Sequence, residues 1–123
     1  MSLSEFEIIE RYFSNVGPQR NDVSISVGDD CAVLQPLPNN DIIVTVDNLV
    51  EGVHFDAGTP VESLAYKAVM VSVSDIAAMG ANPCWLSLAL TLPMPDRHWL
   101  QQFSSGLRTA CDETGIRLVG GNM

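Results

Sequence analysis

Four short polar features interrupt an apolar sequence and could together bind a charged ligand. They are Gly28-Asp29-Asp30, the pair Thr45 and Asp47, the isolated Asp75, and Gly120-Gly121-Asn122. Carboxylates that are brought together from separate elements repel one another unless a cation lies between them. Oxygen ligands suit Mg²⁺ better than zinc, and a Gly-Gly step after a strand lets phosphate oxygens approach backbone N–H groups. The four features are therefore typical of a site for Mg²⁺ and a polyphosphate.

Each feature also has a purely structural interpretation. Gly28-Asp29-Asp30 is a common turn sequence, and Asp47 could simply begin the loop that follows a strand. Asp75 is harder to explain in this way, because an unpaired carboxylate within an apolar helix is costly. Ser72 or Ser74 could be its hydrogen-bond partner.

The histidines and cysteines match no zinc-binding pattern. His54 follows Asp47 in the same loop and could reach a ligand, whereas His98 falls in the first turns of a predicted helix and is expected at the surface. The cysteines are odd in number and each lies in an apolar context: Cys31, Cys84 and Cys111. We expect buried, reduced thiols, which are typical of a cytosolic protein.

Alternating apolar residues predict the strands that carry these features. We expect strands over residues 23–27, 41–47, 85–92 and 116–119, and residues 31–34 could continue the first. In the strand over 41–47 one face carries Ile42, Val44 and Val46, and the other carries Thr45 and Asp47. Three of the four polar features thus follow or close a predicted strand, where α/β folds usually bind ligands.

Helical periodicity predicts one helix before these strands and another between the strands over 85–92 and 116–119. The first begins with a capping box of Ser4 and Glu7 and ends near residues 15–17. Its inward face is expected to carry Phe6, Ile9 and Phe13. The last helix runs from about Trp99 to its C-cap at Gly115.

A further helix is predicted between residues 59 and 79. Thr59 is the expected N-cap, with Pro60 and Glu62 in the first turn, and Gly80 ends the helix. Because residues 69–79 are apolar nearly all round, we expect this helix to be central in the fold.

Length and composition indicate one packed domain. The chain has 123 residues, of which 46% are hydrophobic and 17% charged, and this composition excludes a disordered chain. No stretch approaches the roughly 20 apolar residues of a membrane span, and we see no signal peptide at the N-terminus. Strands that alternate with long helices predict an α/β or α+β domain.

The charge balance disfavours two classes of partner. Fifteen acidic and six basic residues give a formal net charge of −9, whereas nucleic acids and anionic membranes attract lysine and arginine. An acidic domain can still bind phosphates when metal cations bridge the two charges.

Taken in order, these segments resemble the thiamine-monophosphate kinases. The resemblance runs over nearly all of the chain, and its matching stretches are Val27–Leu34, Thr45–Phe55, Leu64–Ala68, Ser74–Ala81 and Leu118–Asn122. It implies an α+β fold with a mixed β-sheet packed by helices, like the N-terminal domain of aminoimidazole ribonucleotide synthetase. Residues 1–123 would form that single ATP- and Mg²⁺-binding domain, without the C-terminal domain expected in the family.

The same resemblance implies an activity and a set of roles. The reaction is the ATP-dependent phosphorylation of thiamine phosphate to thiamine diphosphate in a cytoplasmic homodimer, with Mg²⁺ and no covalent intermediate on a catalytic side chain. The metal ligands would be Asp30, Thr45, Asp47, Asp75 and Asn122. Gly121 and Asn122 would contact ATP, and His54 would contact thiamine phosphate.

Three departures from the family pattern keep alternatives open. Asn122 stands where an aspartate is usual, which weakens one Mg²⁺ position, and Val46 stands where a threonine is common. Family members are also substantially longer, so we expect the isolated chain not to be active alone. The alternatives are a non-catalytic dimerising or nucleotide-sensing module, or another ATP-dependent member of the same superfamily.

Overall fold

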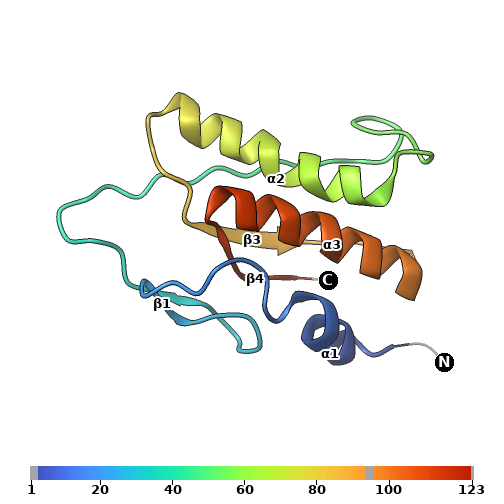
Figure 1. Ribbon diagram of the computed structural model, residues 1–123, viewed down its shortest axis with the longest axis horizontal. Coiled ribbons are helices and arrows are strands. Elements are labelled where there is room, and N and C mark those ends of the chain that lie inside the picture. Colours follow the sequence, from blue (N-terminus) through green and yellow to red (C-terminus); the bar gives the residue numbers. More distant parts are fainter. Residues whose placement is uncertain (1–2, 94–95, 123) are drawn as a thin grey trace.

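A computed structural model describes residues 3–93 and 96–122 and has the expected α+β architecture (Figure 1). Its elements, in chain order, are α1 (Glu5–Ile8), the π-helix η1 (Ile9–Phe13), β1 (Val23–Ile25), β2 (Val33–Leu34), α2 (Val61–Ala78), β3 (Trp85–Ala89), α3 (Arg97–Thr114) and β4 (Arg117–Asn122). β1 pairs antiparallel with β2, and β3 pairs parallel with β4. None of the described helices is long and apolar enough to span a membrane.

The N-terminal helix begins as its sequence predicts. The Ser4 hydroxyl accepts a hydrogen bond from the Glu7 backbone N–H at 3.2 Å. The inward face was predicted wrongly at Phe6, which is 85% exposed, whereas Ile8, Tyr12 and Phe13 are buried. The π-helical turn of η1 contains more residues than an α-helical turn, so the buried face shifts along the sequence.

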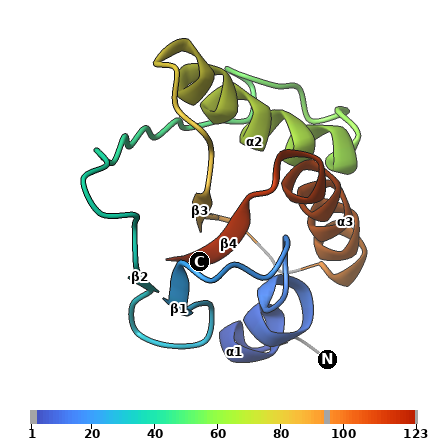
Figure 2. The same ribbon diagram turned by 60° about the vertical axis from the view of Figure 1, so that its left-hand side comes forward.

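The core lies where α3 packs between α2 and the N-terminal helix, as Figures 1 and 2 both show. Apolar residues of α2 and α3 line it: Leu64, Ala65, Val69, Leu100, Phe103, Leu107, Ala110 and Cys111. The third helix was predicted correctly, and it ends at Gly115, whose φ of 74° closes the helix in the left-handed conformation.

Two expectations for α2 are wrong. Pro60, not Thr59, is the capping residue, and no side chain caps the helix. Full burial is confined to the first half of α2, Val73 in the second half is only partly buried, and Met79 just after the helix is 67% exposed. The apolar sequence of 69–79 therefore does not make the helix central, because burial depends on which elements pack against it.

The expected strand over residues 41–47 is absent, since the structure assigns no strand between β2 and α2. Figures 1 and 2 show the chain after β2 moving away from β3 and β4 before it returns to the start of α2. The apolar face of this segment is exposed, at 57% for Ile42, 84% for Val44 and 87% for Val46. A strand requires a neighbour for its backbone hydrogen bonds, and the alternating pattern alone does not provide one.

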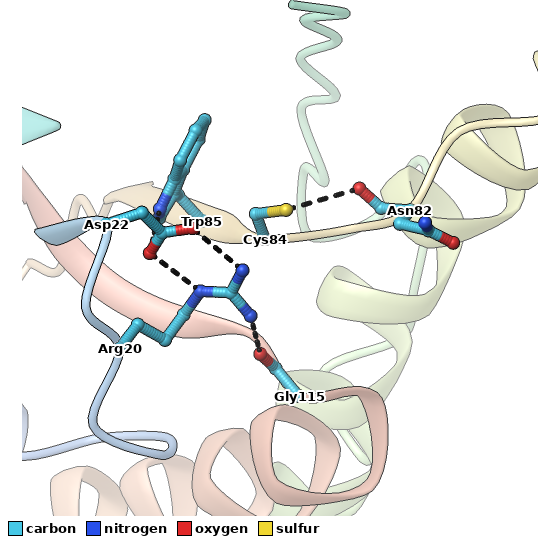
Figure 3. Close-up of polar contacts among 6 residues, drawn as sticks. All are labelled: Arg20, Asp22, Asn82, Cys84, Trp85 and Gly115. Atoms are coloured by element: carbon cyan, nitrogen blue, oxygen red, sulfur yellow. Dashed lines mark hydrogen bonds and ion pairs between the residues drawn. The ribbon is translucent and has the colours of Figure 1, made fainter. Parts of the chain in front are cut away.

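The N-terminal ends of β3 and β4 are held by a polar network (Figure 3). Arg20 donates two hydrogen bonds of 2.9 Å to the carboxylate of Asp22 and one of 2.9 Å to the Gly115 carbonyl. Trp85 donates from its indole N–H to the same carboxylate at 3.1 Å. The hydrogen bond from Arg20 is the main cause of the lowered pKa of Asp22.

A second arginine fixes the N-terminal segment against β4. The buried Arg117 donates to the side-chain oxygen of Asn15 at 2.9 Å and to the Gly17 carbonyl at 2.7 Å. The backbone N–H of Leu118 donates to the Val16 carbonyl at 3.1 Å. Residues 15–17 thus lie directly beside the last strand of the chain.

Candidate functional site

Gly120, Gly121 and Asn122 form the end of β4 rather than a loop after it. Gly121 pairs with Leu88, and the backbone N–H of Leu90 donates to the Asn122 carbonyl at 2.8 Å. Gly121 has a φ of 150°, and a Cβ at this position would overlap the Leu88 carbonyl oxygen. Strand pairing thus requires a glycine at 121, independently of any ligand.

Asp30 lies in the connection between β1 and β2. Its backbone N–H donates to the side chain of Asp29 at 2.8 Å, which is a local turn interaction. Gly28-Asp29-Asp30 thus forms a turn, and the exposed Asp30 carboxylate is accessible to a cation.

Thr45 and Asp47 lie in the irregular segment that replaces the expected strand. Thr45 is half-buried and Asp47 is exposed. Because the segment is not part of a sheet, strand pairing does not fix these two side chains relative to β3 and β4.

Asp75 lies on an exposed part of α2. The argument that its carboxylate is costly therefore fails, because water solvates the charge and no partner such as Ser72 or Ser74 is needed. Its exposure makes it accessible to a cation, which is compatible with the role that the resemblance implies.

His54 belongs to a compact turn that precedes α2. The backbone N–H of Val50 donates to His54 Nδ1 at 2.9 Å, and the N–H of Gly52 donates to the Phe55 carbonyl at 2.7 Å. Phe55 is half-buried against the core. The ammonium group of Lys67 donates to the His54 carbonyl at 2.9 Å, which links the turn to α2.

Lys67 is the residue near the candidate site that sequence reasoning missed. It lies in the stretch Leu64–Ala68 that carries the resemblance, but a lysine on a helix surface has no distinctive pattern. Its partner is a main-chain carbonyl, which is present at every residue and leaves no mark in the sequence.

The predicted metal ligands are not assembled in the part of the chain that the structure describes. Their oxygen donors suit Mg²⁺, but no three acidic, histidine or cysteine side chains among residues 3–93 and 96–122 are placed to hold one ion. Asp30, Asp47 and Asp75 therefore do not fit a shared metal in this arrangement, and we assign no reaction step to a metal here.

Two open hollows are lined by other residues. One, of about 420 Å³, is lined by Leu3, Glu7, Glu10, Arg11 and Arg97. The other, of about 280 Å³, lies between α2 and α3 and is lined by Glu62, Ser63, Tyr66, Lys67, Gly106 and Thr109. Neither contains a predicted site residue.

The cysteines differ in burial, which corrects the expectation that all three are buried. Cys111 is buried, Cys84 is half-buried and Cys31 is exposed, and all three are free thiols. Burial raises the pKa of Cys111 to about 11.

Comparison with known proteins identifies relatives along the entire chain. Residues 28–123 match the family described as AIR synthase related protein, N-terminal domain. The chain is 43% identical to the thiamine-monophosphate kinase of Haemophilus influenzae and 44% identical to that of Escherichia coli K12, each over 122 residues. Both alignments cover 99% of this chain but only 37% and 38% of the relatives.

Solved structures of similarly described proteins have the same fold. The thiamine-monophosphate kinase of Stenotrophomonas maltophilia K279a aligns with a TM-score of 0.79 and 39% identity, covering 100% of this chain and 39% of that one. The Aquifex aeolicus protein aligns with a TM-score of 0.58 and 37% identity over 60% of this chain and 26% of that one. The chain thus spans well under half the length of these relatives.

Proposed function

The chain belongs to the AIR synthase related proteins and contains their N-terminal domain, and we propose that it supplies this domain to a thiamine-monophosphate kinase. The proposed reaction transfers a phosphoryl group from ATP to thiamine phosphate and forms thiamine diphosphate, with Mg²⁺ as the counter-ion of the phosphates. The observation that carries the proposal is the 43–44% identity along 99% of the chain to proteins named for this activity.

We assign the substrate contacts by the resemblance of the motifs. Asp30, Thr45, Asp47, Asp75 and Asn122 are the proposed Mg²⁺ ligands, Gly121 and Asn122 the proposed ATP contacts, and His54 the proposed contact to thiamine phosphate. The exposure of the three aspartates supports this assignment, because exposed carboxylates can bind a cation without a prior desolvation cost. When bound, Mg²⁺ would supply positive charge that offsets the repulsion between these carboxylates and the phosphates.

The proposed enzyme is a cytoplasmic homodimer with a second domain beyond residues 1–123. The unpaired segment 41–47 supports dimerisation through the sheet, because its exposed apolar face and free backbone groups suit pairing with a second copy. The measured mass of the protein expressed from its own gene tests the second domain. A mass well above 13.3 kDa supports it, and a mass of 13.3 kDa contradicts it.

Replacement of the proposed ligands tests the function itself. In the complete enzyme, Asp47→Ala and Asp75→Ala should each weaken Mg·ATP binding and lower the rate of thiamine diphosphate formation. Asp112→Ala, which removes an exposed carboxylate from α3, is the matched control. Unchanged Mg·ATP affinity and turnover in both site variants would refute the assignment of these ligands.

Two residues favour a second candidate, a nucleotide-sensing or dimerising module without catalysis. Asn122 offers no negative charge for a metal, and Val46 offers only its backbone oxygen. Binding of Mg·ATP by the complete protein without turnover of thiamine phosphate would favour this module. Turnover of an aminoimidazole precursor instead would identify another ATP-dependent member of the superfamily.

A further inference from the structure

The turn around His54 fixes the tautomer of the neutral imidazole. Its Nδ1 accepts the backbone N–H of Val50 at 2.9 Å, so the neutral ring carries its proton on Nε2. The backbone N–H groups of Val53 and His54 both donate to the Val50 carbonyl, at 3.1 and 2.9 Å. The exposed ring of His54 therefore has one nitrogen engaged within the turn and the other available as a donor.

Lys67 connects this turn to a rigid part of the fold. Its ammonium group donates to the His54 carbonyl at 2.9 Å across 13 residues of sequence. Lys67 itself is exposed, but its neighbours Leu64 and Ala65 on α2 are 7% and 0% exposed and belong to the core. This hydrogen bond therefore fixes the main chain of His54 relative to α2.

We infer that Lys67 is a positioning residue that acts through His54. It holds the turn against α2 so that the Nε2–H of His54 is available in a fixed place to an oxygen acceptor, such as a phosphate oxygen of the substrate. The part of this inference that concerns substrate rests on the proposed function. The part that concerns the turn can be tested on the complete protein without any substrate.

The first test measures hydrogen exchange at the backbone amides of the complete protein without substrate. Lys67→Gln should raise the exchange rates of Val50 and Gly52 about three- to tenfold, since these amides are protected only within the turn. The amide of Leu107 in α3 should be unchanged, which excludes a global loss of stability. Lys67→Arg should restore most of the protection, and Arg97→Gln, which removes a positive charge elsewhere on the surface, should leave it intact.

If Lys67 holds the turn in place, two variants should both accelerate hydrogen exchange at the Val50 amide. His54→Ala removes the acceptor of the Val50 N–H and should accelerate exchange at Val50 at least as much as Lys67→Gln does. Equal Val50 exchange in the wild-type protein and Lys67→Gln would overturn the inference.

The second test uses steady-state kinetics of the complete enzyme. Lys67→Gln should raise the KM for thiamine phosphate about three- to tenfold, with little change in kcat or in the KM for ATP. In the background of His54→Gln, Lys67→Gln should add almost nothing, because the lysine acts through the histidine. A full additional effect in that background, or an unchanged KM in Lys67→Gln, would overturn the role in substrate binding.

The two tests separate this inference from the proposed function. If the wild-type enzyme does not phosphorylate thiamine phosphate, the proposed function fails and the substrate role of Lys67 fails with it. The exchange rates at Val50 and Gly52 still decide whether Lys67 holds the turn, because they are measured without any substrate.

Discussion

The indole N–H of Trp85 donates to the carboxylate of Asp22 at 3.1 Å, which ties the first residue of β3 to the residue before β1. Arg20 holds the same carboxylate with two hydrogen bonds of 2.9 Å and reaches the carbonyl of Gly115 at the end of α3. The Asp22 carboxylate thus joins its own segment to β3, and Arg20 extends the network to the end of α3. The charge of the carboxylate strengthens each bond that it accepts.

Asp22→Asn should destabilise the chain by about 1 kcal/mol, because the charge is lost and the two-bond contact with Arg20 is broken. The measurement is the midpoint of urea unfolding. Asp112→Asn, at an exposed aspartate of α3, serves as the control and should shift the midpoint little. An equal shift in both variants would show that net charge, rather than this contact, determines the effect.

Stability should also depend on Asp22 at acid pH. The hydrogen bond from Arg20, and then that from Trp85, holds the pKa of Asp22 below its ordinary value of 3.8. The unfolded chain therefore binds the proton first as the pH falls. The contribution of Asp22 is complete above about pH 5, begins to fall as the pH approaches 3.8, and is lost as the pH falls through the lowered pKa of the folded chain. The difference in unfolding free energy between the wild-type protein and Asp22→Asn should shrink from pH 7 to pH 3; a constant difference would contradict the lowered pKa.

Gly121 and Gly120 should differ sharply in their tolerance of a side chain. Gly121→Ala should cost about 2–4 kcal/mol, since its Cβ would overlap the Leu88 carbonyl oxygen at a positive φ. Gly120→Ala places its Cβ where no atom lies within 4 Å and should cost less than about 1 kcal/mol. Chemical unfolding measures both, and similar losses would show that strand pairing does not explain the need for glycine at 121.

The cysteines should react at very different rates with a disulfide reagent. Cys31 is exposed and should react readily at pH 8, whereas Cys111 is buried and burial raises its pKa to about 11. We expect Cys111 to react at least about a hundredfold more slowly than Cys31 until urea unfolds the chain. Cys31→Ser should remove the fast phase, and a fast phase that survives this change would contradict the assignment.

Charge on the unpaired segment should disrupt the proposed dimer without unfolding the chain. Val44 is 84% exposed, so Val44→Lys has little to disturb within one copy but would place a charge in the proposed interface. Light scattering of the complete protein should report a monomer for Val44→Lys and a dimer for Phe6→Lys, at a residue that is 85% exposed on α1. If both variants are dimers, residues 41–47 are not part of the interface.

Elements whose evidence is local could be predicted from the sequence. The stripe of Leu100, Phe103 and Leu107 and the glycine at 115 define α3, and all three side chains of that stripe are buried. The alternation over 85–92 likewise predicts that Leu86, Leu88, Leu90 and Leu92 share one face, and all four pack against the core. Periodicity predicts such elements because each buries its own face.

Features that depend on a partner could not be predicted in this way. The alternation over 41–47 shows that the segment is able to form a strand, but it does not show which strand would pair with it. The central position expected for the second half of α2 failed for the same reason: Val73 is only partly buried against the core, and Met79 is exposed. Residue types indicated the candidate ligands, whereas their convergence requires contacts that the described residues do not make.

Arg117 and Asn15 are joined by a hydrogen bond although 102 residues separate them. During synthesis on a ribosome, the N-terminal segment has no such partner until nearly the whole stretch to β4 has been made. Contacts of such long sequence separation form late, because the loop they close must first lose its conformational freedom. The first helix to be synthesised is therefore among the last to be locked in place.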